Sequence, residues 1–460
     1  MKPVLAFESG TLSLSGLERE ALPEAAARLF RRDERTRNLR ARACDYAPAV
    51  LAMQEAGIEL EDRARAFSPI EDLSLAVKLI PRPHQNTAFA AWRAGLYRGV
   101  AALPTGSGKT VLAVMATAYL KRPAIYLVPT LDLLGQWVTV LERFFKREIG
   151  MLGGGEHSIR ELTVSTYDSA VLNMEFIGNR FAFLVADECH HLPGPETRLA
   201  AAMSIAPYRL GLSATPELPD DRAAVLEDLI GPIVCRIRIG ELEGKVLSHY
   251  RTEQIPVELD PAEAEAYARN RKIYTDFLAA NRINFRFKSE WGRFLGLCAR
   301  QPGGRDVFRA FLEQRRIARG GEAKIRMVWE LVTRHAGERI ILFTADNATA
   351  YDLGRRFCWP VITHRTRPGE RKEFLDLFRD GTYTVLVTSK VLNEGVDVPA
   401  VAVGIILSGS ASVREHVQRL GRILRPAPGK EQALLYELVS SGTGEESVSA
   451  RRREHEAYNQ

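Results

Sequence analysis

Residues 99–120 read GVAALPTGSGKTVLAVMATAYL, and this stretch decides the fold of the region around it. A short apolar run, GVAAL, precedes a glycine-rich loop, GSGKT, and an apolar segment with helical spacing follows. LPTGSGKT at 103–110 falls one residue short of the full GxxxxGKT pattern, but a strand before the loop and a helix after it are typical of a phosphate-binding loop. A plain glycine-rich turn is the alternative.

The loop residues have distinct expected roles. Glycines let backbone N–H groups wrap phosphates, and the helix N-terminus adds a favourable dipole. Lys109 can neutralise charge on the β- and γ-phosphates, and the Thr110 hydroxyl can ligate Mg²⁺. The other loop residues that we expect to bind the nucleotide are Thr105, Gly106, Ser107 and Gly108.

The stretch FLVADECHHLP at 183–193 supplies the carboxylates that such a loop needs. We expect Asp187 to hold Mg²⁺, through water, and Glu188 to orient or deprotonate the attacking water. Cys189 and His190 beside two carboxylates also raise the possibility of zinc. A zinc site needs a second ligand cluster, however, and the sequence has no CxxC or HxxxH elsewhere. The hypothesis is therefore ATP hydrolysis with magnesium.

The chain has 460 residues, about three times the length of a typical domain. From about 76 to 240, short apolar runs alternate with helical patterns, and the same alternation returns from about 322 to 440. This alternation predicts an α/β fold with two parallel sheets wrapped by helices. Residues 1–75 suggest a small α+β unit with an N-terminal hairpin. We interpret its arginine-rich stretch, TRNLRARACDYAP, as a solvated face.

Residues 269–319 differ from both α/β regions. They contain 13 Lys and Arg against 4 Asp and Glu, a local net charge of 13 − 4 = +9, which exceeds the +6 of the whole chain. Eight aromatic residues are interleaved with these charges. We expect most aromatics to form the core of a small helical subdomain and the excess positive charge to face the phosphate backbone of DNA.

The composition is that of a soluble globular protein. Five cysteines without pairing motifs indicate a reduced, intracellular chain. No signal peptide and no apolar stretch long enough to span a membrane is present in the sequence, so we expect a cytoplasmic protein without membrane contact.

Two further motifs fit the same chemistry. SAT at 213–215 ends an apolar strand, where small hydroxyl residues could connect the nucleotide site to a moving domain. In QRLGRILR, Arg422 and Arg425 lie three apart on one helical face and could reach a γ-phosphate as arginine fingers. A solvated basic helix is the alternative.

At this point the chain resembles a superfamily-two helicase. The ordered motifs that carry the resemblance are PRPHQ, LPTGSGKT, VPTLDLLGQW, VSTYDSA, DECHH, SAT, FTADN, THRT, LNEGVDVP and QRLGRILR. Within that superfamily the chain resembles the XPB group, and closely its compact archaeal-type members. The segments specific to that group are SIAPYRLGLSAT, ITHRTRPGER, SGSASVREHVQRLGRILRP and LYELVSSGTGE.

The resemblance implies a particular domain order. We expect a damage-recognition-like domain at 1–75 and a first RecA-like domain at 76–240. The start of the second domain and a basic helical thumb would occupy 241–325. The second RecA-like domain would span 326–445, with a C-terminal tail at 446–460 and ATP bound between the two RecA-like domains.

The resemblance also assigns residue roles. For nucleotide binding it adds Gln85, Gly395 and Asp397, and for catalysis it adds Gln418 to Lys109, Asp187, Glu188, Arg422 and Arg425. The residues that it implies for DNA contact are Thr130, Thr166, His364, Arg365 and Thr388. Those that it implies for coupling the nucleotide site to the second domain are His190, Ser213 and Thr215.

Family members use ATP hydrolysis to move along or open duplex DNA in nucleotide excision repair. By resemblance we expect 3′→5′ movement on duplex, forked or damaged DNA, association with the nucleoid if the source is prokaryotic, and a partner nuclease. One departure matters. The group carries an Arg-Glu-Asp triplet after SAT, whereas this chain has Leu218, Pro219 and Asp220.

This departure keeps two other functions open. One is a duplex DNA translocase or remodeller that never separates strands. The other is a damage-binding module that recruits a nuclease and uses ATP to set its conformation. Arg222, which lies nearby, could substitute for the missing arginine.

Overall fold

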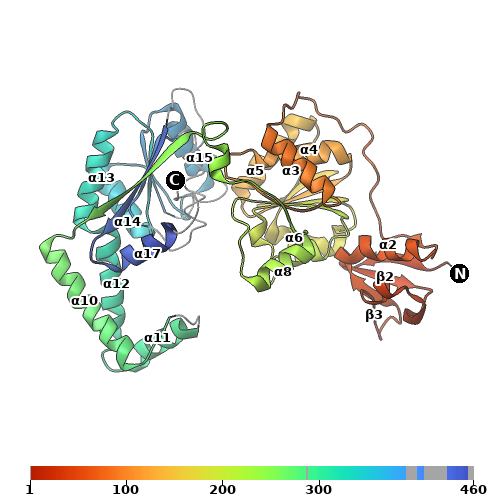
Figure 1. Ribbon diagram of the computed structural model, residues 1–460, viewed down its shortest axis with the longest axis horizontal. Helices are drawn as coiled ribbons and strands as arrows, with labels where there is room; N and C mark the ends of the chain where they lie inside the picture. Colours follow the sequence, from red (N-terminus) through yellow and green to blue (C-terminus); the bar gives the residue numbers. More distant parts are fainter. Residues whose placement is uncertain (1, 286–288, 390–400, 409–431, 454–460) are drawn as a thin grey trace. The chain divides into compact units, whose positions relative to one another are not determined.

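The computed structural model describes residues 2–285, 289–389, 401–408 and 432–453 (Figure 1). The chain divides into two compact units, residues 1–242 and 243–460. Each unit is described by itself. None of the helices in the described ranges is long and apolar enough to cross a membrane.

The first unit begins with a five-stranded sheet in the order β3-β4-β2-β1-β5. Its strands are β1 Val4–Glu8, β2 Thr11–Ser15, β3 Arg31–Arg32, β4 Leu39–Arg42 and β5 Glu61–Asp62. Its helices are α1 Glu24–Ala27 and α2 Tyr46–Glu55. β1 and β2 form the predicted hairpin, and its two turn residues, Ser9 and Gly10, both have positive φ, as a tight hairpin turn requires.

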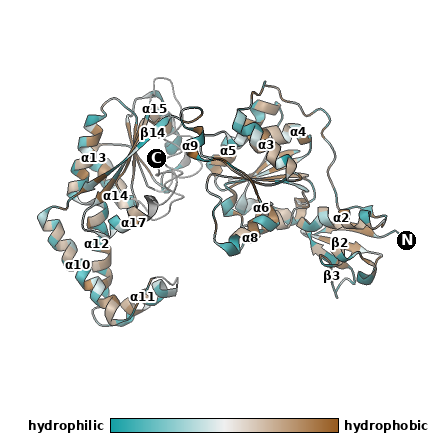
Figure 2. Cartoon of the chain, in the orientation of Figure 1, coloured by the Kyte–Doolittle hydropathy of each residue, from teal (hydrophilic) through white to brown (hydrophobic). Residues whose placement is uncertain are grey.

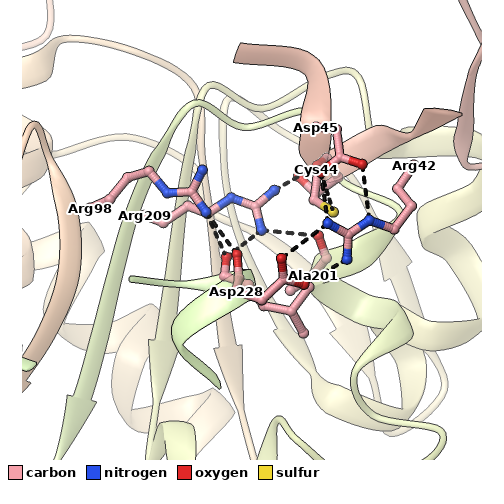
Figure 3. Close-up of polar contacts among 9 residues, drawn as sticks. Arg42, Cys44, Asp45, Arg98, Ala201, Arg209 and Asp228 are labelled. Atoms are coloured by element: carbon pink, nitrogen blue, oxygen red, sulfur yellow. Dashed lines mark hydrogen bonds and ion pairs between the residues drawn. The ribbon is translucent and has the colours of Figure 1, made fainter. Parts of the chain in front are cut away.

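Polar contacts fasten this small sheet to the rest of the unit (Figure 3). Arg42 donates hydrogen bonds of 2.6 and 3.0 Å to the carboxylate of Asp228, which lies in helix α8 (Asp220–Leu229), and also pairs with Asp45. Nearby, the fully buried Arg209 donates to four backbone carbonyls, including those of Ala201 and Leu229. Arg42 is exposed, as the interpretation of the arginine-rich stretch as a solvated face predicts, but it also forms an ion pair with a residue outside the small sheet.

An eight-stranded sheet forms the larger part of the first unit, in the order β13-β6-β12-β11-β7-β10-β8-β9. Its strands are β6 Arg98–Ala102, β7 Ala124–Val128, β8 Gly150–Gly153, β9 Glu156–Ser158, β10 Leu162–Thr166, β11 Phe183–Asp187, β12 Tyr208–Ser213 and β13 Ile233–Arg236. Its helices are α3 Pro83–Ala94, α4 Lys109–Leu120, α5 Leu131–Phe145, α6 Tyr167–Ile177, α7 Leu199–Ala202, α8 Asp220–Leu229 and α9 Ile239–Leu242. All pairings are parallel except β8 with β9, so the predicted parallel sheet is confirmed.

Alternate residues of the central strands belong to two apolar clusters, one on each face of this sheet. In β7, Tyr126 packs in the cluster that contains residues of α3, α4 and α5, whereas Leu127 packs in the cluster that contains residues of α6, α7 and α8. Burial on both faces explains why the strands read as continuous apolar runs. The carboxyl ends of β6, β11 and β12 consequently meet at one edge, where the candidate site lies.

The second unit contains a six-stranded parallel sheet in the order β14-β19-β18-β15-β17-β16. Its strands are β14 His249–Val257, β15 Ile340–Phe343, β16 Val361–Ile362, β17 Val385–Thr388, β18 Val403–Ile406 and β19 Gln432–Ser440. The helices around it are α13 Glu322–Arg334, α14 Asn347–Phe357, α15 Pro368–Asp380 and α17 Gly444–Arg453. β14 and β19 pair over nine residues. The tail boundary predicted after residue 445 falls inside α17. Figure 2 shows hydrophilic residues on the outer faces of α8 and α13.

Three helices, α10 Pro261–Ala280, α11 Ser289–Arg300 and α12 Gly304–Gly320, form the segment expected to be a thumb. Tyr274, Phe294 and Phe311 are buried in their common core, with Phe277 and Phe308 packed against it. The prediction that most of the aromatics are core residues is thus confirmed. Two other aromatic residues of this segment are exposed, Phe285 at 40% and Trp291 at 41%.

Candidate nucleotide site

The glycine-rich loop connects the end of β6 to the start of α4. Gly106 and Gly108 have φ values of +83° and +89°, a region that glycine adopts without strain. A Cβ atom on Gly108 would also clash with Gln85 Nε2. Inside the loop, the Ser107 hydroxyl donates to the Pro104 carbonyl at 2.7 Å. The geometry is therefore that of a phosphate-binding loop, with Lys109 and Thr110 as the first residues of α4.

Side chains of α3 hold this loop from one side. Gln85 donates from Nε2 to the carbonyls of Ser107 at 3.1 Å and Gly108 at 3.3 Å, and its Oε1 accepts from the Arg82 backbone. His84 Nε2 lies 2.8 Å from the same Ser107 carbonyl. Gln85, predicted to bind nucleotide, is thus buried against the loop and fixes its backbone.

Lys109 and Glu188 face each other next to the loop. Lys109 Nζ lies 3.7 Å from Glu188 Oε1 and 3.4 Å from the Leu103 carbonyl, and both side chains are mostly buried. The loop lysine and the second carboxylate, 79 positions apart in the sequence, are therefore brought together by the fold. An ammonium group at this point can bind a phosphate oxygen in place of the carboxylate.

Asp187, at the carboxyl end of β11, is held by three donors. Trp137 Nε1 of α5 donates to its Oδ2 at 2.8 Å, the Glu188 amide donates to its Oδ1 at 3.0 Å, and the Tyr167 hydroxyl donates to its backbone carbonyl. Burial raises the pKa of Asp187 to about 6, and the neighbouring Glu188 charge adds to this rise. Lys109 and the Trp137 hydrogen bond act in the opposite direction.

Trp137 is a site residue whose role no sequence pattern indicated. It is the last residue of the quoted motif VPTLDLLGQW, which marks it as part of a motif but not as the partner of a carboxylate 50 positions away. A buried donor to the proposed magnesium ligand both orients that ligand and favours its charged form.

The residues after Asp187 connect the site to the end of β12. His190 Nδ1 lies 3.2 Å from the Ser213 hydroxyl and 3.5 Å from Glu188 Oε2, and the Thr215 amide donates to Ser213 Oγ at 3.1 Å. Cys189 is fully buried in an apolar cluster, where burial raises the pKa of its thiol. Its thiol therefore packs in the core, which contradicts a metal-ligand role for it.

The site suits a magnesium nucleotide. The hydroxyl of Thr105 and Oε2 of Glu188 are buried without a hydrogen-bond partner in the described part of the chain, so both atoms are available to bind a ligand. Carboxylate and hydroxyl oxygens are the donors that Mg²⁺ prefers, and Lys109 supplies the positive charge for phosphates.

The predicted DNA contacts of the first unit lie at two neighbouring helix ends. Thr130 caps α5 by accepting from the Leu133 amide at 3.3 Å, and Thr166 caps α6 by accepting from the Ser169 amide at 3.2 Å. The preceding strands, β7 and β10, pair directly. Two helix N-termini consequently begin next to each other, an arrangement that favours anions.

The second unit places its predicted DNA contacts near the ends of β16 and β17. His364 and Arg365 are exposed, and His364 Nδ1 lies 3.2 Å from Asn347 Nδ2. Thr388 is fully buried, and its hydroxyl donates to the Ser389 carbonyl. The other predicted residues of this unit, Gly395, Asp397, Gln418, Arg422 and Arg425, lie outside the described residues.

Comparison with known proteins agrees with this geometry. The XPB helicase damage recognition domain family matches residues 5–64, the type III restriction enzyme res subunit family matches 78–218, and the helicase conserved C-terminal domain family matches 323–427. The helicase domain of Pyrococcus furiosus Hef covers 80% of this chain, and the match spans 97% of that structure, with a TM-score of 0.52 and 18% identity. S. cerevisiae Dbp5 bound to RNA and ADP BeF3 covers 81% of this chain and 87% of its own, with a TM-score of 0.56 and 15% identity. The fold and the site define an ATP-hydrolysing enzyme of the superfamily-two helicase class.

Sequence relatives narrow this class. The DNA 3'-5' translocase XPB2 of Sulfurisphaera tokodaii is 38% identical over 87% of this chain and 90% of its own. The DNA 3'-5' helicase XPB of Kineococcus radiotolerans is 30% identical over 81% of this chain, although the match spans only 62% of that protein. The chain therefore belongs to the XPB family of helicases. The predicted family, the two RecA-like folds and the helicase class of enzyme are confirmed.

Proposed function

We propose that this chain is an ATP-driven 3′→5′ DNA helicase or translocase that acts on duplex, forked or damaged DNA in nucleotide excision repair. The observation that carries the ATPase part is the convergence of Lys109, Asp187 and Glu188 at one sheet edge, with Trp137 fixing the aspartate. DNA as the substrate is supported by the names of the relatives and by the basic thumb. The proposal includes a cytoplasmic location with DNA and a partner nuclease.

ATP with Mg²⁺, when bound, supplies the phosphoanhydride to be hydrolysed and a cation that neutralises its charge. Lys109 binds the phosphates, and backbone N–H groups of residues 105–108 surround them. Thr110 and Asp187 hold the cation. Glu188 orients the attacking water and accepts its proton. Its Oε2 makes no hydrogen bond among the described residues, although His190 Nδ1 lies 3.5 Å away.

Hydrolysis is coupled to movement through His190, whose ring lies between Glu188 and Ser213. A change in the charge or position of Glu188 is therefore transmitted through His190 and Ser213 to the segment that leads into α8. Gly395, Asp397, Gln418, Arg422 and Arg425 complete the site from the second domain in this proposal. Thr130, Thr166, His364, Arg365 and Thr388 contact the DNA backbone.

One observation favours a second candidate function, duplex translocation without strand separation. Leu218 packs against the apolar cluster on one sheet face, and Pro219 precedes the first turn of α8, where Asp220 begins the helix. The position of the family's Arg-Glu-Asp triplet is thus occupied by a core side chain and a helix start, which supply no cation. The nearby Arg222 lies within α8.

ATP turnover and two DNA assays on one preparation of the unmodified chain, together with one variant, test these functions. ATP turnover with and without DNA tests the main proposal, and a basal turnover that no nucleic acid stimulates would contradict it. Unwinding of forked DNA and displacement of a triplex strand separate the two enzyme functions, since displacement without unwinding identifies a translocase. Glu188→Gln is the third arm. We expect it to bind ATP but to lose at least about a hundredfold in turnover, and a variant that still stimulates a nuclease would point to a recruitment module.

A further inference from the structure

A groove of about 560 Å³ lies between α12 of the thumb and α14 of the second sheet domain, two helices that are neighbours in Figure 1. Each helix contributes residues spaced one or two turns apart, so that facing stripes form the walls. The contact is close at one end, because a side chain on Gly320 would press on Thr349. All of these residues belong to the second unit, within which the groove is defined.

The lining of this groove is strongly basic. Its charged residues are five arginines and two aspartates, a net charge of 5 − 2 = +3: Arg315, Arg316, Arg319, Arg355, Arg356, Asp346 and Asp352. The lining includes no aromatic side chain, so the groove offers no surface on which a base could stack.

Most of these charges already have partners. Arg316 pairs with Glu313 at 2.8 Å, and Arg356 pairs with Glu322 and with Asp352. Arg355 lies 3.7 Å from the same Asp352. These pairs account for three of the five arginines.

Asp346 has a structural role at the same place. Its Oδ1 caps α14 by accepting from both the amide and the hydroxyl of Thr349, at 2.9 and 3.0 Å. The carboxylate that faces the unpaired part of the groove is thus engaged by the start of a helix.

Arg315 and Arg319 make no ion pair or hydrogen bond with any other residue that the structure describes. Arg315 stacks over the Phe311 ring at 5.0 Å. Burial lowers the pKa of Arg315, and the charge of Arg319 adds to the lowering, whereas Tyr274 and Asp346 act weakly in the opposite direction. Two guanidinium groups one turn apart repel each other unless an anion lies between them, and their planar donors match phosphate oxygens.

We propose that this groove binds the phosphodiester backbone of nucleic acid, with Arg315 and Arg319 as its principal ligands. The inference rests on the proposed function, because it specifies where the DNA strand is held. Nucleic acid is favoured over a free nucleotide because the lining lacks an aromatic side chain for stacking a base. It is favoured over an isolated anion because the groove continues a segment, residues 269–319, with a net charge of +9.

The test compares two pairs of substitutions that remove the same charge. The groove pair is Arg315→Gln with Arg319→Gln, and the control pair is Arg300→Gln with Arg305→Gln, two exposed thumb arginines outside the groove. Binding of a fluorescent DNA duplex to the full chain is measured against salt concentration. We expect the groove pair to weaken binding roughly tenfold and to reduce the slope of log K against log salt by about 1.8, the contribution of two phosphate contacts on a duplex. Basal ATP turnover should be unchanged in both.

The outcomes separate the two proposals. Absence of DNA binding by the unmodified chain overturns the proposed function itself. DNA binding whose slope falls equally for both pairs overturns the groove, because general thumb charge then explains it. Polyglutamate serves as the probe for an acidic protein segment, and the quantity measured is the rise in unfolding midpoint that it causes. If the groove pair keeps its DNA affinity but loses this rise, the groove binds an acidic protein segment and the proposal is wrong.

A second readout does not involve DNA. Because Arg315 and Arg319 repel each other, we expect the unfolding midpoint of the groove pair without polyanions to be equal to or above that of the unmodified chain. A fall of several degrees would show that these arginines stabilise the fold, and it would overturn their role as ligands.

Discussion

Replacing Trp137 by phenylalanine tests how the site keeps Asp187 ionised. The indole N–H donates to Asp187 Oδ2 at 2.8 Å in a buried setting, and burial has already raised the pKa of this carboxyl to about 6. Phenylalanine fills most of the same space but cannot donate. The charged form of Asp187 then loses a partner, so its pKa must rise further.

The size of the shift follows from the hydrogen bond. A bond to a charged group contributes about 1.5–3 kcal/mol, and one pKa unit corresponds to about 1.4 kcal/mol. We therefore expect the acid limb of the kcat/KM profile for ATP hydrolysis, which reports the free enzyme, to move by about 1–2 units toward neutral pH. Activity at pH 8.5 should recover more than activity at pH 6.5.

Trp92→Phe provides the matched control. Trp92 is also fully buried in the first unit, and its indole N–H donates to the Arg209 carbonyl at 2.8 Å, not to a carboxylate. Both variants should lose comparable stability in urea titrations, but only Trp137→Phe should move the pH limb. An unmoved limb in Trp137→Phe, or an equal movement in both variants, would refute the reasoning.

Three other predictions concern the first unit. Gly108→Ala places a side chain at φ +89° against Gln85, at a backbone cost of about 1–2 kcal/mol; we expect at least a tenfold loss of nucleotide affinity in a fluorescent-ADP titration, and unchanged affinity would contradict the loop geometry. Arg209→Met removes a buried donor from four carbonyls, of which Ala201 and Leu229 also accept from the Ser204 amide and from Arg98, so we expect a loss of about 3–5 kcal/mol and a melting point lower by roughly 10 °C; calorimetry showing no change would disprove a stabilising role for Arg209. The folded pKa of Asp187 is raised from 3.8 to about 6, so its stabilising contribution is fully present below pH 3.8 and is lost as pH rises through about 6. The total change in the free energy of unfolding is about 3 kcal/mol without nucleotide. Asp187→Asn should flatten this part of the urea stability profile, and an unaltered profile would rule out Asp187 as the cause.

The sequence predicted the sheets because of how their central strands are buried. β7 and β11 are covered on both faces, so each reads as an apolar run, AIYLV and FLVA, next to turn residues. The loop at residues 103–110 was equally predictable, since glycine conformation and phosphate binding leave a local pattern. Local patterns therefore indicated both the fold class and the residues that carry the ATP chemistry.

Other features depend on contacts that leave no local pattern. Strand β14, HYRTEQIPV, is largely polar and only partly buried because it lies at the sheet edge, so no apolar run in the sequence indicates it. Trp137 reaches Asp187 across 50 positions, and Arg42 reaches Asp228 across 186. Periodicity and spacing describe one element at a time and cannot say which distant side chain will lie against another.

The pairing of β14 with β19 bears on how the chain is made. The first residues of the two strands are 432 − 249 = 183 positions apart, and among the described strands β14 pairs with β19 alone. At roughly 5–20 residues per second, a ribosome needs about 10–40 s to complete that interval. During this interval the first unit can finish folding, whereas the nine residues of β14 lack the strand with which their backbone groups pair. The second unit thus acquires its full sheet only after residue 440 has been made, and a nascent chain that stalls before residue 432 displays an open strand edge prone to wrong pairing.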